Sequence, residues 1–241
     1  MRDVLILPFS QEERLVIASD NSGAVGEKEH DLVKVDYETV AYFSLRVAMM
    51  ECMAVGAKPV AIVIQNFVGE GEWKRFKKGA HQLFQELQID PIPITGSTES
   101  NFSVMQSAIG FIVIGRLHVS KKKFGITLKQ AKYAVIGEPL VGHEVLEKRE
   151  KVAPLSLFKS LVNHPKIYEI VPIGSKGIYY ELEQLLKNNH IQIGNVSSPL
   201  DIDKSAGPAT CFLISYDLKG EREIRDLSGE YFHPIENNLF Y

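Results

Sequence analysis

The segment SDNSGAVGEKEHD, near the start of the chain, combines acidic, basic and glycine residues. These residues are Asp20, Gly23, Gly26, Lys28 and Asp31. Aspartate carboxylates bind a hard cation such as Mg²⁺, a lysine ammonium binds phosphate, and glycine lets the backbone approach a ligand closely. The alternative is a solvated glycine-rich hairpin. The segment is not a Walker A loop, because the pattern GxxxxGK[ST] is absent.

Glu51 is a second candidate, within the stretch RVAMMECMAVGAKP. Apolar residues recur at steps of three and four from Val40 to Ala54, which predicts a helix that ends at Gly56. Glu51 then lies near the helix C-terminus, where the helix dipole disfavours a carboxylate. A metal ion or a basic group would offset that cost. The alternative is an exposed surface glutamate.

A third candidate lies in ITGSTESNFSVMQSAIGFIVIG, from Ile94 to Gly115. The stretch begins with apolar residues, passes through a small polar turn, and ends in an apolar run that predicts a buried strand. The residues of the turn that could bind a ligand are Gly96, Ser97, Thr98, Glu99 and Asn101. Backbone N–H groups, hydroxyls and a carboxylate at a strand end are what phosphates and Mg²⁺ need. The alternative is a loop that only turns the chain.

Strands and helices of mixed order must position these segments. In the first half we predict strands over 4–7, 15–18, 32–35, 60–65 and 109–114, and helices over 40–54 and 71–88. In the second half we predict strands over 133–136, 168–171 and 211–216, and helices over 142–149, 154–162 and 176–187. The tail after Lys219 has no assignment. This order predicts α+β layers, with a polar junction over 118–130.

Composition restricts the class of protein. The chain has 241 residues, of which 45% are hydrophobic and 24% charged, and its net charge is −3. These values describe a globular protein, and the lack of a basic stripe argues against nucleic acid as a partner. Cys52 and Cys211 lie in apolar runs and are expected to be buried thiols in a reducing compartment. No signal peptide and no apolar run of about 18 residues is found, so we expect a cytoplasmic protein without a membrane contact.

Three of these segments, in this order, resemble the superfamily of aminoimidazole ribonucleotide synthetase, also called PurM-like. They are SDNSGAVGEKEHD, RVAMMECMAVGAKP and ITGSTESNF. The superfamily has an acidic glycine-containing loop, then a helix that ends in an acidic residue before Gly-Ala-x-Pro, then a Gly-Gly-acidic-Thr loop. The resemblance covers about residues 1–118 well and the rest loosely. It implies an N-terminal ATP- and Mg²⁺-binding domain over 1–118, through which family members pair as homodimers, and a smaller α/β C-terminal domain over 119–241.

The resemblance also implies roles for individual residues. Asp20 matches the first acidic position, Glu51 stands where the family has Asp, and Lys28 resembles a lysine that follows the first loop. The implied metal ligands are Asp20, Asp31, Glu51 and Glu99. The implied nucleotide-binding residues are Gly23, Gly26, Lys28, Gly96, Ser97, Thr98 and Asn101, and the implied catalytic residues are Asp20, Lys28 and Glu51. Ser97 replaces the acidic residue of the third motif, and Glu99 is the candidate to supply that carboxylate.

Within the superfamily the chain most resembles a short branch, the α-ribazole kinases. The phrases that carry this likeness are ASDNSGAVGEKEHD and TGSTESNF, together with the compact length. Selenophosphate synthetase would show a cysteine in its N-terminal segment, and the hydrogenase maturation member ends in a cysteine, whereas this chain ends NNLFY. The expected activity is ATP-dependent phosphorylation of a nucleoside hydroxyl. The alternatives are an ATP-dependent ligase or cyclase, and a nucleotide-binding module without catalysis.

Overall fold

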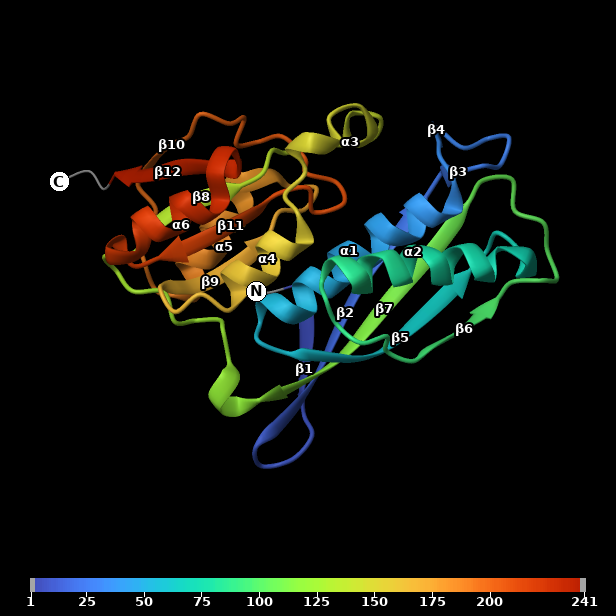
Figure 1. Ribbon diagram of the computed structural model, residues 1–241, viewed down its shortest axis with the longest axis horizontal. Helices are drawn as coiled ribbons and strands as arrows, with labels where there is room; N and C mark the ends of the chain where they lie inside the picture. The colour runs from blue at the N-terminus through green and yellow to red at the C-terminus, as the bar shows by residue number, and fades with distance from the viewer. Residues whose placement is uncertain (1–2, 239–241) are drawn as a thin grey trace. The chain divides into compact units, whose positions relative to one another are not determined.

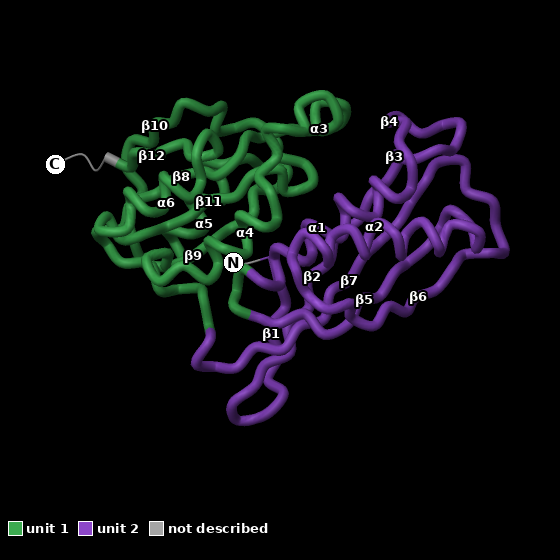
Figure 2. The backbone as a smooth tube through the Cα atoms, viewed as in Figure 1, with its two compact units in different colours: residues 1–2, 54–56, 122–241 green, residues 3–53, 57–121 purple. Residues whose placement is uncertain are grey.

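Two compact units make up the chain, and the computed structural model describes residues 3–238 (Figure 2). The N-terminal unit consists of residues 3–53 and 57–121, and the C-terminal unit contains residues 54–56 and the chain from 122 onward. The sequence-based domain boundary between 118 and 119 stands close to this division. The two units are of nearly equal size, whereas the resemblance implied a smaller C-terminal domain.

A five-stranded mixed sheet forms the base of the N-terminal unit (Figure 1). Its order is β1-β2-β7-β5-β6, with β5 and β6 parallel and the other neighbours antiparallel. The strands are β1 (Val4–Pro8), β2 (Glu13–Gly23), β5 (Lys58–Asn66), β6 (Ile94–Thr98) and β7 (Ala108–His118). A short parallel pair, β3 (Val25–Gly26) and β4 (Val33–Lys34), follows β2.

Two helices cover one face of this sheet, α1 (Tyr37–Ala54) and α2 (Trp73–Glu86), the second preceded by the 3-10 turn η1 (Glu70–Glu72). Residues of β7 alternate between buried and half-buried, which is the pattern of a sheet with a single covered face. The other face carries Leu5 and Leu7 of β1, which are 54% and 39% exposed. Their cross-strand partners Ile17 and Leu15 share that face, so an apolar surface of the sheet lies open in the single chain.

Two strands run further into the polar segments than predicted. The ladder between β2 and β7 continues from the pair Glu13 and His118 to the pair Gly23 and Ala108. Asp20 is therefore a strand residue and not part of a loop. The parallel ladder between β5 and β6 similarly continues to the pair Asn66 and Thr98. Backbone hydrogen bonds to the neighbouring strand set where each of these strands ends. The polarity of the side chains does not indicate these bonds.

The C-terminal unit is built on a second antiparallel sheet, of order β10-β12-β8-β11-β9. Its strands are β8 (Lys132–Ile136), β9 (Ile167–Pro172), β10 (Asn195–Ser197), β11 (Phe212–Tyr216) and β12 (Phe232–Asn238). Its helices are α3 (Glu144–Glu147), α4 (Leu155–Val162), α5 (Gly177–Asn188) and α6 (Glu221–Ser228). Short 3-10 turns are η2 (Val119–Lys121), η3 (Arg149–Lys151), η4 (Leu218–Gly220) and η5 (Gly229–Tyr231). The tail without a predicted assignment forms α6 and β12.

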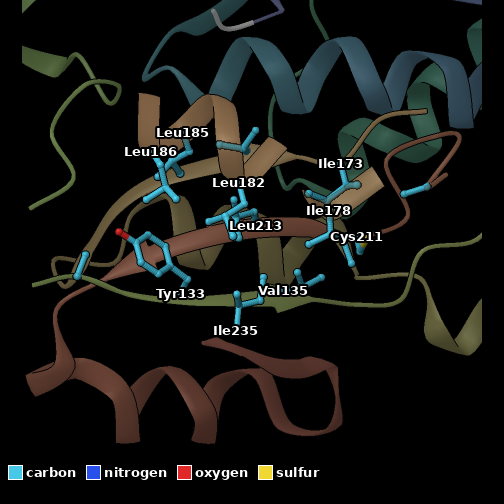
Figure 3. Close-up of a cluster of buried hydrophobic side chains, with 13 residues drawn as sticks. Tyr133, Val135, Ile173, Ile178, Leu182, Leu185, Leu186, Cys211, Leu213 and Ile235 are labelled. Atoms are coloured by element: carbon cyan, nitrogen blue, oxygen red, sulfur yellow. The ribbon is translucent and has the colours of Figure 1, made fainter. Parts of the chain in front are cut away.

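Helices cover both faces of this second sheet. Leu182 of α5 packs with Leu213 of β11 in one apolar cluster (Figure 3). The preceding strand residue, Phe212, points to the other face of the sheet. Its ring meets the ring of Phe158 of α4, with 5.3 Å between centroids. All five residues of β11 are buried as a result. Cys52 and Cys211 are buried free thiols, as predicted, and no helix of the described chain is long and apolar enough to cross a membrane.

Candidate functional site

Asp20 is a half-buried acidic residue whose surroundings offer little compensation for its charge. It pairs with the buried Phe111 of β7, and it follows Val16 and Ala18 on the face that the helices cover. Burial raises the pKa of its carboxyl to about 6, against a smaller opposing effect of a hydrogen bond from the Asn21 backbone. Within residues 3–238 no basic side chain forms an ion pair with it. Its burial therefore favours the neutral carboxyl, and a bound cation would offset the cost of the charge.

Asp31 is held by protein groups on both carboxylate oxygens. Its Oδ1 accepts the Ser107 backbone N–H at 2.7 Å, and its Oδ2 accepts the Ser107 hydroxyl at 2.7 Å and the Lys28 backbone N–H at 2.8 Å. Burial acts to raise the pKa of Asp31, but the hydrogen bonds and the charge of Lys34 outweigh it and leave that pKa lowered. The residue is only 6% exposed. This carboxylate joins the segment after β3 to the start of β7.

Lys28 joins three segments of the N-terminal unit. Its ammonium donates to the carbonyl oxygens of Phe67 at 3.0 Å and Val104 at 2.7 Å. Gly26, two residues earlier, has φ of +151°, and a Cβ there would lie 2.5 Å from the Ser107 hydroxyl oxygen. Contacts within the protein thus explain the Lys28 ammonium and the glycine at position 26 without a ligand. A Cβ at Gly23, by contrast, would meet no atom within 4 Å.

Thr98, the last residue of β6, receives hydrogen bonds from two side chains. Its Oγ1 accepts the indole Nε1–H of Trp73 at 2.8 Å and the amide Nδ2–H of Asn66 at 3.2 Å. Gly96 lies two residues earlier on the same face, and a Cβ there would overlap the Ile64 carbonyl and lie 2.8 Å from the Trp73 ring. Only glycine leaves room for that indole.

The other residues predicted from the third segment are separated from Thr98. Ser97 pairs with Gln65 and points to the open face of the sheet, because successive strand residues alternate. Glu99 caps its own turn, since its Oε1 accepts the backbone N–H groups of Asn101 at 2.7 Å and Phe102 at 3.2 Å. Asn101 is exposed beside it.

Glu51 is buried, at 8% exposed, in the last turn of α1. The exposed-glutamate alternative is therefore wrong. Its neighbour Cys52 packs against Gly115 of β7, whereas Asp20 pairs with Phe111 of the same strand. Four strand residues span about 13 Å, so the two carboxylates belong to different levels of the sheet.

The structure does not bring the four predicted metal ligands together. Among the described residues no three His, Cys, Asp or Glu side chains gather as a metal site. Hydrogen bonds hold Asp31 and Glu99 in their own loops, and Glu51 lies at another level of the sheet. Mg²⁺ usually takes one or two carboxylates together with substrate phosphates and water. Of the four, Asp20 fits that role.

Sequence reasoning missed four residues that organise the site. Trp73 was assigned only to the apolar face of its helix, and Tyr37, Asn66 and Ser107 were not singled out. Asn66 directly follows an apolar strand, which is a signal that could have been used. Ser107 and Tyr37 have no such signal, because their 2.9 Å hydrogen bond joins positions distant in the sequence.

Comparison with solved structures places the whole chain on one fold. The Aquifex aeolicus thiamine-monophosphate kinase complexed with AMPPCP and TMP matches 99% of this chain and 86% of its own, with 14% identity and a TM-score of 0.64. HypE in the HypE–HypF complex matches 93% of this chain and 85% of its own, with 14% identity and a TM-score of 0.63. Thermotoga maritima PurL complexed with ADP matches 100% of this chain, which spans 44% of that protein, with 9% identity and a TM-score of 0.62.

Sequence comparison alone finds no relative. No protein-family profile matches the chain, and no curated protein matches it. The similarity is therefore one of backbone architecture, and it extends over both units. The chain shares the mixed α/β fold of these solved structures.

Proposed function

We propose that this protein is an ATP-dependent kinase that phosphorylates a hydroxyl group of a small molecule. Asp20 carries the proposal, as a half-buried carboxylate without a basic partner on the helix-covered face of the sheet. The same fold is found in a thiamine-monophosphate kinase that was solved with an ATP analogue and TMP. Ionised above a pKa of about 6, Asp20 would meet a cation at neutral pH.

Phosphoryl transfer requires an acceptor oxygen and the leaving ADP in line on the γ-phosphorus. The bond from the acceptor oxygen to that phosphorus forms, the bond to the β–γ bridging oxygen breaks, and the hydroxyl proton passes to solvent or base. Mg²⁺ bound with ATP would supply charge neutralisation, and Asp20 would hold it. Thr98 would contact a phosphate oxygen, with the backbone of Gly23, Gly96 and Asn101 as further candidates, whereas Ser97 lies on the opposite face.

Lys28 and Asp31 take positioning roles in this scheme. The two carbonyl bonds of Lys28 leave one of its three ammonium protons for a phosphate. Asp31 holds the ends of two loops, and its oxygens are occupied. The proposed division is Asp20 for the metal and Asp31 for the loops around it. Glu51, in the last turn of α1 at another level of the sheet, takes no direct part in this scheme.

The first candidate acceptor is a neutral nucleoside, α-ribazole. Its support is the likeness of ASDNSGAVGEKEHD and TGSTESNF to the α-ribazole kinases and the absence of surplus basic residues in these segments. A phosphorylated acceptor would call for additional arginine or lysine contacts. TMP is the second candidate, because it is bound in the neighbouring kinase structure.

Incubation with ATP, Mg²⁺ and each candidate acceptor, followed by mass spectrometry, tests the function. Equal amounts of ADP and phosphorylated nucleoside support the kinase. ADP with inorganic phosphate and a cyclised formylglycinamidine ribonucleotide supports the ligase or cyclase. Nucleotide binding without ADP formation over the whole panel supports the non-catalytic module.

We also propose that two copies pair through the open face of the N-terminal sheet. Leu5 and Leu7 are exposed there beside the half-buried Ile17, Ile112 and Ile114. Apolar surface of this kind is stabilised by association. Light scattering at micromolar concentration should give the mass of a dimer, and Leu7→Glu should give a monomer. A monomeric wild-type chain would contradict the pairing.

A further inference from the structure

The hydroxyl of Thr98 can act only as a donor toward a further partner. A hydroxyl oxygen has two lone pairs and one proton. The indole Nε1–H of Trp73 and the amide Nδ2–H of Asn66 both donate to this oxygen. Both lone pairs are thereby engaged, and the proton must point away from these two groups.

The orientation of the Asn66 amide is fixed by its other contacts. Its oxygen accepts the backbone N–H groups of Val68 at 2.9 Å and Gly69 at 3.3 Å, and its nitrogen donates to the Gly69 carbonyl at 2.8 Å. A flipped amide would lose all three bonds. Asn66 is 1% exposed, so water does not replace these contacts.

Trp73 is held equally firmly. Its indole lies over Gly96 and meets the ring of Phe76 edge-on, with 6.4 Å between centroids. In residues 3–238 no acceptor takes the proton of Thr98, and Thr98 is half-buried at the end of β6. Two ordered side chains thus donate to one hydroxyl, and the proton of that hydroxyl has no acceptor among the described residues. Accepting two hydrogen bonds also strengthens that hydroxyl as a donor.

We propose that Trp73 and Asn66 are positioning residues that aim the Thr98 proton at a phosphate oxygen of the bound nucleotide. This inference rests on the proposed function, which supplies the nucleotide. An anionic oxygen is the acceptor that gains most from such a donor, because the hydrogen bond is charge-assisted. Trp73 is the only tryptophan of the chain, so its fluorescence reports on the hydrogen bond at Thr98.

Titration with Mg-ADP tests the inference without turnover, by calorimetry and by tryptophan fluorescence. Wild type should bind ADP and change its fluorescence in parallel. Thr98→Val should weaken ADP binding about tenfold and lose the fluorescence change, because a charge-assisted hydrogen bond is removed. Thr98→Ser keeps the hydroxyl and should stay within about twofold of wild type. Thr95→Val is the matched control, since Thr95 lies on the opposite face of the same strand and is exposed.

Trp73→Phe separates a positioning role from a structural one. An aromatic ring remains, whereas the Nε1–H donor and part of the bulk of the indole are lost. The variant should fold and should raise KM for ATP about threefold, with KM for the acceptor unchanged. Circular dichroism confirms the fold of each variant. If Thr98→Val binds ADP as tightly as Thr95→Val, or Trp73→Phe has the wild-type KM for ATP, the inference is overturned. If wild type binds no ADP by calorimetry, the proposed function itself fails.

Discussion

Two strand carboxylates, the buried Glu169 of the C-terminal unit and the half-buried Asp20 of the N-terminal unit, have contrasting surroundings. Glu169 of β9 is 2% exposed, and its Oε1 accepts the Thr127 hydroxyl at 2.8 Å and the Asn189 amide at 2.7 Å. The same oxygen accepts the backbone N–H groups of Ile126 at 3.0 Å and Thr127 at 3.1 Å. Asp20 of β2 has one backbone hydrogen bond from Asn21 and a pKa raised to about 6. The hydrogen bonds of Glu169 stabilise its unit, whereas the partly buried charge of Asp20 destabilises the N-terminal unit.

The two sheets also differ in how many of their faces are covered by helices. Helices cover both faces of the C-terminal sheet, so all of β11 is buried. The N-terminal sheet has one covered face, which carries Asp20, Gly96 and Thr98, and one open apolar face. A carboxylate whose charge is partly buried without a basic partner is a candidate for ligand binding. The contrast supports the proposal that the N-terminal unit binds the ligand and that Glu169 has a mainly structural role.

The largest expected effect is on turnover. Asp20→Asn preserves size and removes the charge that would hold Mg²⁺, so kcat/KM should fall by about three orders of magnitude. Glu169→Gln is the matched control and should keep kcat/KM per folded molecule within about twofold. Steady-state kinetics at saturating and limiting Mg²⁺ measure both. An Asp20→Asn enzyme with the wild-type rate at limiting Mg²⁺ would contradict the assignment.

The second effect is on the stability of the C-terminal unit. Glu169→Gln replaces a charged acceptor of four hydrogen bonds by a neutral one and should lower the free energy of unfolding by about 2 kcal/mol. Urea unfolding followed by circular dichroism measures it. Glu236→Gln, an exposed glutamate on β12 of the same unit, is the control and should change stability by less than about 0.5 kcal/mol. If both variants change the free energy of unfolding equally, the hydrogen bonds of Glu169 do not stabilise the unit, and the contrast between Glu169 and Asp20 fails.

Asp20→Asn should make the protein more stable. The folded pKa of about 6 lies above the ordinary 3.8, so the wild-type chain is destabilised where Asp20 is ionised in both states. At pH 8 the variant should gain about 1–2 kcal/mol, less than the full shift would give because Asp20 is partly exposed. The gain should shrink as pH falls from about 6 and vanish below about 4. Urea unfolding at several pH values checks this, and a gain independent of pH would point to another cause.

The smallest effect concerns the loops that Asp31 joins. Asp31→Asn keeps one acceptor oxygen and should reduce stability by about 1 kcal/mol while raising KM for ATP several-fold. Ser107→Ala removes one of the same hydrogen bonds and should behave alike. Unfolding curves and initial rates measure the two quantities. If Asp31→Asn abolishes turnover as completely as Asp20→Asn, Asp31 is a metal ligand and the division between them fails.

The sequence predicted helices and strands better than it predicted the hydrogen bonds between side chains. The helix over 40–54 was predicted from apolar residues at steps of three and four, and the strand over 60–65 from a nearly continuous apolar run. They correspond to α1 and β5. Asp20 and Thr98 were chosen for their chemistry, but the strand of Asp20 was predicted too short and Thr98 was placed in a turn, because ladder pairing is not visible in one sequence. The occupancy of Asp31 and the indole bond of Trp73 depend on segments distant in the chain.

The most direct test of the account is a single mass-spectrometric experiment on the wild-type chain. The purified protein is incubated with ATP and Mg²⁺ together with equal amounts of α-ribazole and TMP. The account predicts ADP and an equal amount of α-ribazole carrying one added phosphoryl group, with both products absent for Asp20→Asn. Phosphorylated TMP alone would keep the kinase and replace its acceptor. ADP formation with neither compound phosphorylated, or unchanged product from Asp20→Asn, would contradict the account.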